Sequence, residues 1–127
     1  MSDVSTLLAP PSDVEVAKAL AHYFNLLAAE YGSRLAGVYL FGSRARRDHR
    51  PDSDADIAVV LTSFQGTALD EKMRLVDLGF EALTDAGVMI QPWPFTSAEW
   101  EWSGAGGRFA DLLVAAKRDA KPLEMWA

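Results

Sequence analysis

The chain contains no cysteine, which excludes a disulfide framework and any zinc site built on thiolates. It also lacks an apolar run long enough for a membrane span, so we expect no membrane-spanning helix. Its first residues carry Asp3 where a signal peptide would need positive charge, and we expect no secretion signal. By elimination, these absences predict a cytoplasmic protein.

Basic residues are also few, with 12 Lys and Arg against 18 Asp and Glu and a net charge of −6. This balance argues against an extensive nucleic-acid-binding surface. The exception is a cluster of arginines within one short segment: Arg44, Arg46, Arg47 and Arg50. We expect the cluster either to meet an anionic group or to be solvated, and for Arg47 and Arg50 both interpretations stay open.

What is present is a chain of 127 residues, half of them hydrophobic, which is enough to bury one core. We therefore predict a single domain over residues 1–127, in which residues 1–11 form a flexible N-terminal segment. Ser12 and Glu15 make a capping box before a helix that is predicted to end at Tyr31. Two apolar runs, residues 35–41 and 54–61, have the composition of buried strands.

A second long helix is predicted over residues 67–86, with one face directed at the core. The apolar positions expected on that face are Leu69, Met73, Leu75, Val76, Phe80 and Leu83. A third strand is expected to begin at Val88 and to end near Pro92 and Pro94, because proline disrupts strand pairing. A second capping box, Thr96 with Glu99, and a final helix bearing Phe109, Leu112, Leu113 and Ala116 follow. This order predicts an α/β (α+β) fold, a small mixed β-sheet with helices packed on it.

The chemistry-bearing segment begins with Gly42-Ser43, directly after the first predicted strand. A glycine at the start of a short helical turn allows close approach to a ligand, and the backbone N–H groups there can hold a phosphate. Ser43 adds a hydroxyl donor. Arg44 and Arg46 are positioned to add charge-assisted contacts to a phosphate tail.

Asp54 and Asp56 are two positions apart on a predicted strand, so their side chains project from the same face. Two carboxylates this close repel one another unless a cation lies between them. Mg²⁺ prefers oxygen ligands and usually takes only a few from the protein. The pair is therefore a candidate metal site beside a candidate phosphate site.

These residues resemble a known family. Gly42-Ser43, a polar loop and the Asp54-Ala55-Asp56 motif before an apolar strand are similar to the pattern of the nucleotidyltransferase superfamily that includes DNA polymerase beta and the minimal nucleotidyltransferases. The resemblance implies a nucleotidyltransferase fold in which Gly42 and Ser43 bind the phosphates of ATP or another nucleoside triphosphate. It also implies that Asp54 and Asp56 are catalytic and hold Mg²⁺ in a two-metal site.

The reaction that the resemblance implies is transfer of a nucleoside monophosphate, AMP from ATP, to a hydroxyl of a protein or small acceptor. Minimal members are commonly paired with a helical HEPN-type toxin, so the resemblance also implies an antitoxin role and such a partner.

The sequence departs from this pattern at two positions. Active members have a third carboxylate on the next strand, where this chain has Gln91, and the two-metal site is incomplete to that extent. Glu99 and Glu101 lie further along the chain, in a segment that reads as a helix start. Arg47 stands where the family usually has glycine, and a positive φ there would cost an arginine about 1 kcal/mol or more.

Three functions are consistent with the sequence. The first is the metal-dependent transferase. The second is a catalytically degenerate nucleotidyltransferase fold that neutralises a partner by complex formation, which the absent third acid favours. The third, an RNA-nucleotide transferase, is disfavoured because the short acidic chain has no second domain to hold RNA.

Overall fold

The computed structural model describes residues 12–101 and 110–123, with the backbone alone for residues 81–86. The segment 1–11, predicted to be flexible, and Phe109 lie outside the described residues. None of the helices in the described part is both long enough and apolar enough to cross a membrane.

Helix α2 (Asp13–Tyr31) begins as the sequence predicts. The Ser12 hydroxyl accepts a hydrogen bond from the Glu15 amide at 3.2 Å, and the Glu15 carboxylate accepts one from the Ser12 amide at 3.1 Å. The helix ends at Gly32, whose φ of 55° suits a residue without a Cβ. Its inner face is buried at the helical spacing expected for an amphipathic helix: Val16, Ala19, Leu20, Tyr23, Leu27 and Tyr31.

In the described residues, the sheet has four strands in the order β3-β2-β1-β4. Their bounds are β1 (Leu35–Phe41), β2 (Ala55–Leu61), β3 (Ile90–Thr96) and β4 (Lys121–Pro122). β2 pairs with β3 in parallel, and β1 pairs with both β2 and β4 antiparallel. The predicted mixed sheet is confirmed. β4 was not predicted, because two residues are too few to show an alternating pattern.

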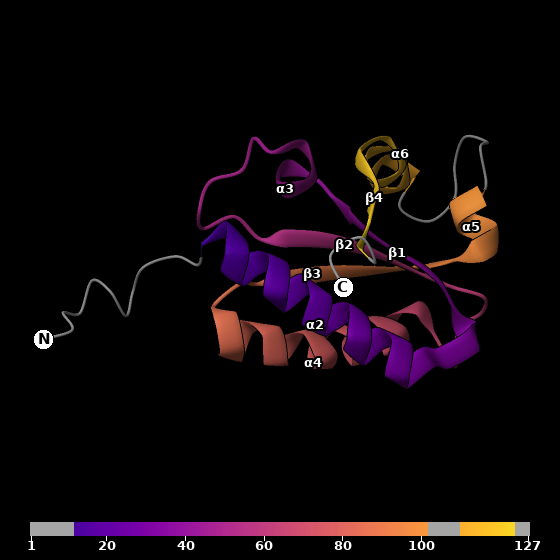
Figure 1. Cartoon of the computed structure of the whole chain (residues 1–127). Coiled ribbons are helices and arrows are strands. Elements are labelled where there is room, and N and C mark those ends of the chain that lie inside the picture. Colours follow the sequence, from indigo (N-terminus) through magenta and orange to yellow (C-terminus); the bar gives the residue numbers. More distant parts are fainter. Residues whose placement is uncertain (1–11, 102–109, 124–127) are drawn as a thin grey trace, which may run out of the picture.

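Helices cover both faces of the sheet (Figure 1). On one face, α2 and α4 (Ala68–Ala86) enclose the larger core with inward residues of the strands such as Leu40, Ile57 and Val59. On the other, α5 (Ser97–Glu101) and α6 (Ala110–Asp119) accompany a smaller cluster around Ala58 and Phe95. The start of β2 on this second face remains open to a ligand, since Asp56 is the single residue of the strand that is not buried.

The third strand begins at Ile90, two residues later than predicted, and continues through both prolines to Thr96. The prediction that the prolines end the strand was wrong. The Met89 carbonyl accepts a hydrogen bond from the Ala55 amide at 2.9 Å, so by alternation the backbone groups of Gln91 and Trp93 face β2. The two prolines point to the free edge of the sheet, where a missing N–H breaks no ladder bond.

The face that α4 turns to the core was also predicted wrongly. Leu69, Met73 and Phe80 are exposed, together with Val76, whereas Leu75 is buried as predicted; the side chain of Leu83 lies outside those described. The buried face instead includes Glu71, which is fully enclosed and pairs with Arg74 and, at 3.7 Å, with Arg34. An apolar pattern does not include a buried, paired carboxylate among the core positions. The predicted apolar stripe was therefore assigned to the wrong face of α4.

Candidate active site

The site begins where β1 gives way to α3 (Ser43–Arg46), the short helix that the sequence predicts. Gly42 occupies the N-cap with φ 77° and ψ −156°, a conformation that L side chains rarely adopt. The Gly42 carbonyl accepts the Arg46 amide at 3.0 Å. The N–H groups of the first turn have no acceptor within such a helix, so they are available to an anion.

Asp56 lies directly against Gly42. A Cβ built on Gly42 would lie 2.5 Å from Oδ2 of Asp56, well inside van der Waals contact. The strand register explains the approach, because Phe41, the residue before Gly42, is the antiparallel partner of Asp56. The structure thus brings together the glycine and the carboxylate that the sequence singled out separately.

The two aspartates differ in environment. Asp54 is exposed just before β2, while Asp56 is half-buried on the face that also carries Ala58. Burial, and then the negative charge of Asp54, raise the pKa of Asp56, and the positive charges of Arg46 and Lys72 oppose that rise. The carboxylate pair is therefore a place where a further cation would relieve repulsion.

Gln91 occupies the position expected of a third acid. It is the parallel partner of Asp56 in the register between β2 and β3, so the two side chains share a face. Glu99 and Glu101 do not replace it. Glu99 caps α5 by accepting from the Thr96 amide at 3.0 Å, and α5 and α3 lie at opposite ends of the sheet (Figure 1).

The guanidinium of Arg44 is used in hydrogen bonds within the protein. Its guanidinium is buried and donates to the carbonyls of Ser53 at 2.9 Å and Pro51 at 3.1 Å. These bonds tie the short helix to the loop that ends at Asp54. This role could not be predicted from the sequence, because any residue type can provide a loop carbonyl.

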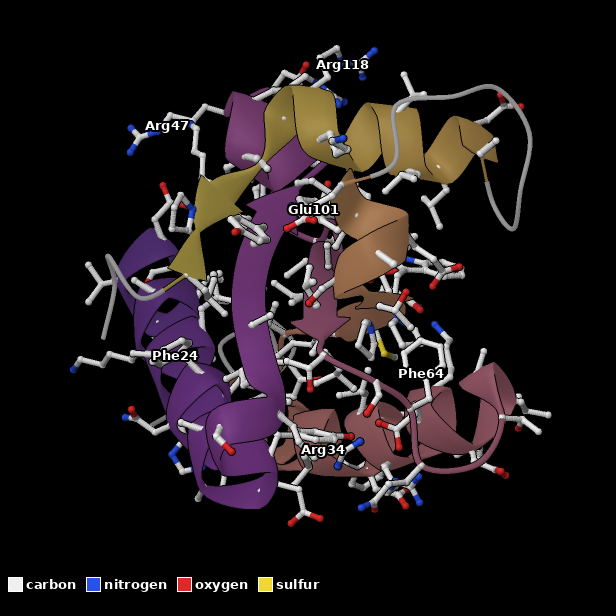
Figure 2. All side chains as sticks on the ribbon, turned by 90° about the vertical axis from the view of Figure 1, so that its right-hand side faces the viewer. Phe24, Arg34, Arg47, Phe64, Glu101 and Arg118 are labelled. Carbon is white, nitrogen blue, oxygen red and sulfur yellow. The ribbon has the colours of Figure 1, made fainter. Side chains whose placement is uncertain are left out.

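The side chains of Arg46 and Arg47 lie in different environments. Arg46 donates to Asp119 at 2.7 Å and to Asp48 at 3.1 Å, and so links α3 to α6. Arg47 has φ 65° and ψ 28°, the left-handed conformation, at the position where the family usually has glycine. Figure 2 shows its side chain directed away from the ribbon into solvent.

Sequence reasoning missed Lys72, which comes from α4. Its ammonium donates to the Pro92 carbonyl at 2.6 Å and lies 3.7 Å from the centroid of the Trp93 ring. Burial lowers the pKa of Lys72, and the negative charge of Asp56 raises it. No local spacing links Lys72 to Asp56, because only the parallel crossover from β2 through α4 to β3 brings them near each other.

A separate cavity of about 660 Å³ lies between α2 and the loop after α3. Its apolar floor includes Val16, Leu20 and Leu40, and its rim includes Arg44 and His49. The predicted phosphate and carboxylate residues Gly42, Ser43, Asp54 and Asp56 are not among the described residues that line it. This cavity is therefore distinct from the carboxylate site.

The oxygen donors at this site suit a single metal ion. Within the described ranges, no three or more His, Asp or Glu side chains form a cluster that could hold an ion. Two carboxylates with an open side nevertheless suit one Mg²⁺, which typically takes one or two carboxylates and completes its shell with water and substrate phosphate. Asp54 and Asp56 fit one ion of this kind.

Comparison with known proteins finds a family match and a related protein. Residues 25–85 match the family model described as polymerase beta, nucleotidyltransferase. A stretch of 43 residues, 34% of this chain, is 42% identical to a candidate protein adenylyltransferase of Methanocaldococcus jannaschii, of which it covers 43%. The match thus spans less than half of that relative.

Two solved structures are similar in fold. A candidate nucleotidyltransferase of Sulfolobus solfataricus has a TM-score of 0.52 at 22% identity, over 68% of this chain and 74% of that one. A toxin–antitoxin complex with AMP-PNP has a TM-score of 0.55 at 19% identity, over 84% of this chain and 80% of that one. At these identities the likeness establishes the fold alone.

Proposed function

Because residues 25–85 match the family model described as polymerase beta, nucleotidyltransferase, we propose that this chain transfers AMP from ATP to a hydroxyl of a protein or small acceptor. The observation that carries the proposal is the contact of Asp56 with Gly42. It sets a carboxylate of raised pKa beside the first turn of α3, so a group that attracts a cation adjoins a group that attracts phosphate.

Each side chain has a definite task in this proposal. The backbone at Gly42 and the hydroxyl of Ser43 bind the outer phosphates, and Asp54 and Asp56 hold Mg²⁺. Bound there, the ion would neutralise charge on the phosphates as the bond to pyrophosphate breaks. Arg46 supports the site because its positive charge lowers the pKa of Asp56. To contact a phosphate as expected, its guanidinium would have to bind Asp119 and the phosphate at the same time.

The reaction forms a bond between the acceptor oxygen and the α-phosphorus, and it breaks the bond from that phosphorus to pyrophosphate. The acceptor hydroxyl loses its proton in this step. Gln91 cannot take that proton, since an amide is not basic at neutral pH. In this proposal the proton passes to solvent, because Asp54 and Asp56 are both used as metal ligands.

Arg44 does not bind phosphate in this proposal. Its buried guanidinium already serves two loop carbonyls, so its task is to hold the loop that presents Asp54.

The acceptor that we propose is a protein partner of the toxin class. The match to a candidate protein adenylyltransferase and the likeness to a toxin–antitoxin complex support this choice, and a HEPN-type toxin is the partner that the family resemblance suggests. The site would then act inside the cell, where ATP and Mg²⁺ are abundant.

The test combines purified chain, Mg²⁺, ATP labelled at the α-phosphate and the protein encoded by the neighbouring gene. We expect label to appear on that protein, and to be absent with the Asp54→Ala/Asp56→Ala variant. Tight complex formation without label, unchanged in the variant, would replace the transferase with the second candidate function.

That second candidate is a nucleotidyltransferase fold that neutralises a partner by binding alone. The specific observation in its favour is Gln91 opposite Asp56, because this substitution removes the third ligand on which a second ion depends.

A further inference from the structure

Four apolar side chains form a row along the outer face of α4. Leu69, Met73, Val76 and Phe80 have exposed fractions of 67%, 53%, 36% and 64%. Their separations of four, three and four positions repeat as in the seam of packed helices. Single exposed apolar residues are ordinary, but a continuous row over several turns marks an interaction surface. We call these four residues the α4 row.

The row cannot turn inward, because the opposite face of α4 is fixed. The hydroxyl of Tyr23 in α2 donates to the Leu75 carbonyl at 2.9 Å. Glu71 is fully buried in its ion pair with Arg74, and Figure 2 shows Arg34 beside this part of α4. A rotation of α4 that buried the row would expose Leu75 and separate the Glu71 carboxylate from the arginines that pair with it.

The charge beside the row is negative. Asp70 and Asp77 are exposed, each directly after a member of the row. Of the cations in α4, Lys72 is used by the Pro92 carbonyl and the Trp93 ring. Arg74 is used by Glu71 and by the Gln65 carbonyl. The Asp70 carboxylate also serves the chain, because it caps α4 by accepting from the Thr67 amide at 2.9 Å. Asp77 is therefore the main acid that the described part of this flank presents to solvent.

We propose that the α4 row is a docking surface for an amphipathic helix of a partner protein, one with an apolar row of the same spacing and lysine or arginine beside it. Apolar burial provides the attraction, and the acidic flank selects a basic partner. A second copy of this chain fits less well. Two α4 helices packed antiparallel would set Asp70 and Asp77 against the same acids of the twin.

The test uses three synthetic helices of about 21 residues, whose length covers the row. One has leucine at the seam spacing with flanking lysine, one has the same seam with flanking glutamate, and one has the lysine composition in scrambled order. Binding to the full chain is measured by fluorescence anisotropy at physiological salt. We expect the lysine helix to bind at least about tenfold more tightly than either of the others.

Variants in and beside the α4 row test whether the helix binds there. Met73→Gln/Phe80→Gln should weaken binding of the lysine helix at least about tenfold, while Asp77→Lys should shift preference toward the glutamate helix. Val114→Gln is the matched control, since Val114 is 67% exposed on α6 and lies outside the row. Circular dichroism should show that all variants keep the wild-type melting temperature within a few degrees.

Equal binding by wild type and Met73→Gln/Phe80→Gln, or no preference between lysine and glutamate helices, would overturn the proposal. A concentration-dependent dimer in analytical ultracentrifugation, lost in the same double variant, would assign the row to a second copy instead. The Asp54→Ala/Asp56→Ala variant should bind the lysine helix as wild type does, so the result stands apart from nucleotide transfer.

Discussion

Oδ2 of Asp56 lies 2.5 Å from the point where a Cβ on Gly42 would be. The contact means that the carboxylate and the backbone of the α3 turn are packed without a side chain between them. An alanine at position 42 would have to displace Asp56 as well as adopt a φ of 77°.

Gly42→Ala should therefore weaken binding of Mg²⁺ and ATP by at least about tenfold and destabilise the fold by about 1–3 kcal/mol. Isothermal titration calorimetry and urea unfolding measure the two effects. Gly32→Ala is the matched control, because Gly32 also has a positive φ of 55° but open space around its Cβ position. If both variants lost stability and only stability, the contact with Asp56 would have no part in ligand binding.

Asp56→Asn should abolish Mg²⁺-dependent ATP binding yet leave the free protein slightly more stable at neutral pH. The pKa of Asp56 is raised in the folded protein, so folding favours the protonated carboxyl and ionisation opposes folding. The gain should be below about 1 kcal/mol, because water screens a half-buried group.

The pH dependence of stability in the same variant tests the direction of the Asp56 pKa shift. Wild type and Asp56→Asn should be equally stable below the unfolded pKa of about 3.9, and the deficit of wild type should grow as the pH rises through the folded pKa. Thermal melts from about pH 3 to 8 measure it. A wild type more stable than the variant at pH 7 without Mg²⁺ would contradict the raised pKa.

Gln91→Asp should restore a third carboxylate opposite Asp56. We expect Mg²⁺ affinity and the rate of label transfer to rise about tenfold, because a second ion gains a ligand. Without metal, the added charge should raise the pKa of Asp56 further and lower stability by about 1 kcal/mol. Gln65→Asp, at an exposed position away from the site, controls for net charge, and an equal effect there would rule out a specific metal ligand.

Arg44→Lys separates a loop anchor from a phosphate ligand. Lysine keeps the positive charge but cannot reproduce the paired donation to Ser53 and Pro51. We expect a loss of about 1–3 kcal/mol in unfolding free energy, with a weaker and indirect loss of ATP affinity. Retained stability with reduced ATP binding would show instead that the guanidinium meets the phosphates.

Arg47→Gly should stabilise the protein by up to about 1 kcal/mol. The gain comes from relief of the left-handed conformation at φ 65°, reduced by the greater freedom of glycine in the unfolded chain. Arg50→Gly makes the same change of charge at a residue of the described chain whose φ is not positive, so it should not stabilise. Guanidinium unfolding of both variants compares them directly.

Local signals in the sequence predicted much of the fold. The capping box at Ser12 and Glu15, the buried strand before Gly42 and the turn of α3 all depend on neighbouring residues, and each is confirmed. Asp56 beside Gly42 followed from the family pattern. The positive φ of Arg47 was left open by the sequence, which indicated only what such a conformation would cost an arginine.

The features that were missed depend on contacts between distant segments. Lys72 reaches Trp93 only after α4 packs on β3, and Arg44 is buried only once the loop to Asp54 has closed over it. The inner face of α4 was hidden because Glu71 is buried through pairing with arginines. Apolar periodicity cannot detect a buried position that is filled by a charge.

The prolines of β3 have a consequence for how this protein can associate. Pro92 and Pro94 face the open edge of the sheet with no N–H to offer, and the Pro92 carbonyl is already taken by Lys72. An extended peptide cannot add itself to this edge through backbone hydrogen bonds, and neither can a misfolded neighbour. Recognition at this edge must therefore proceed through side chains and surface shape, and the sheet is protected from growing into an aggregate on that side.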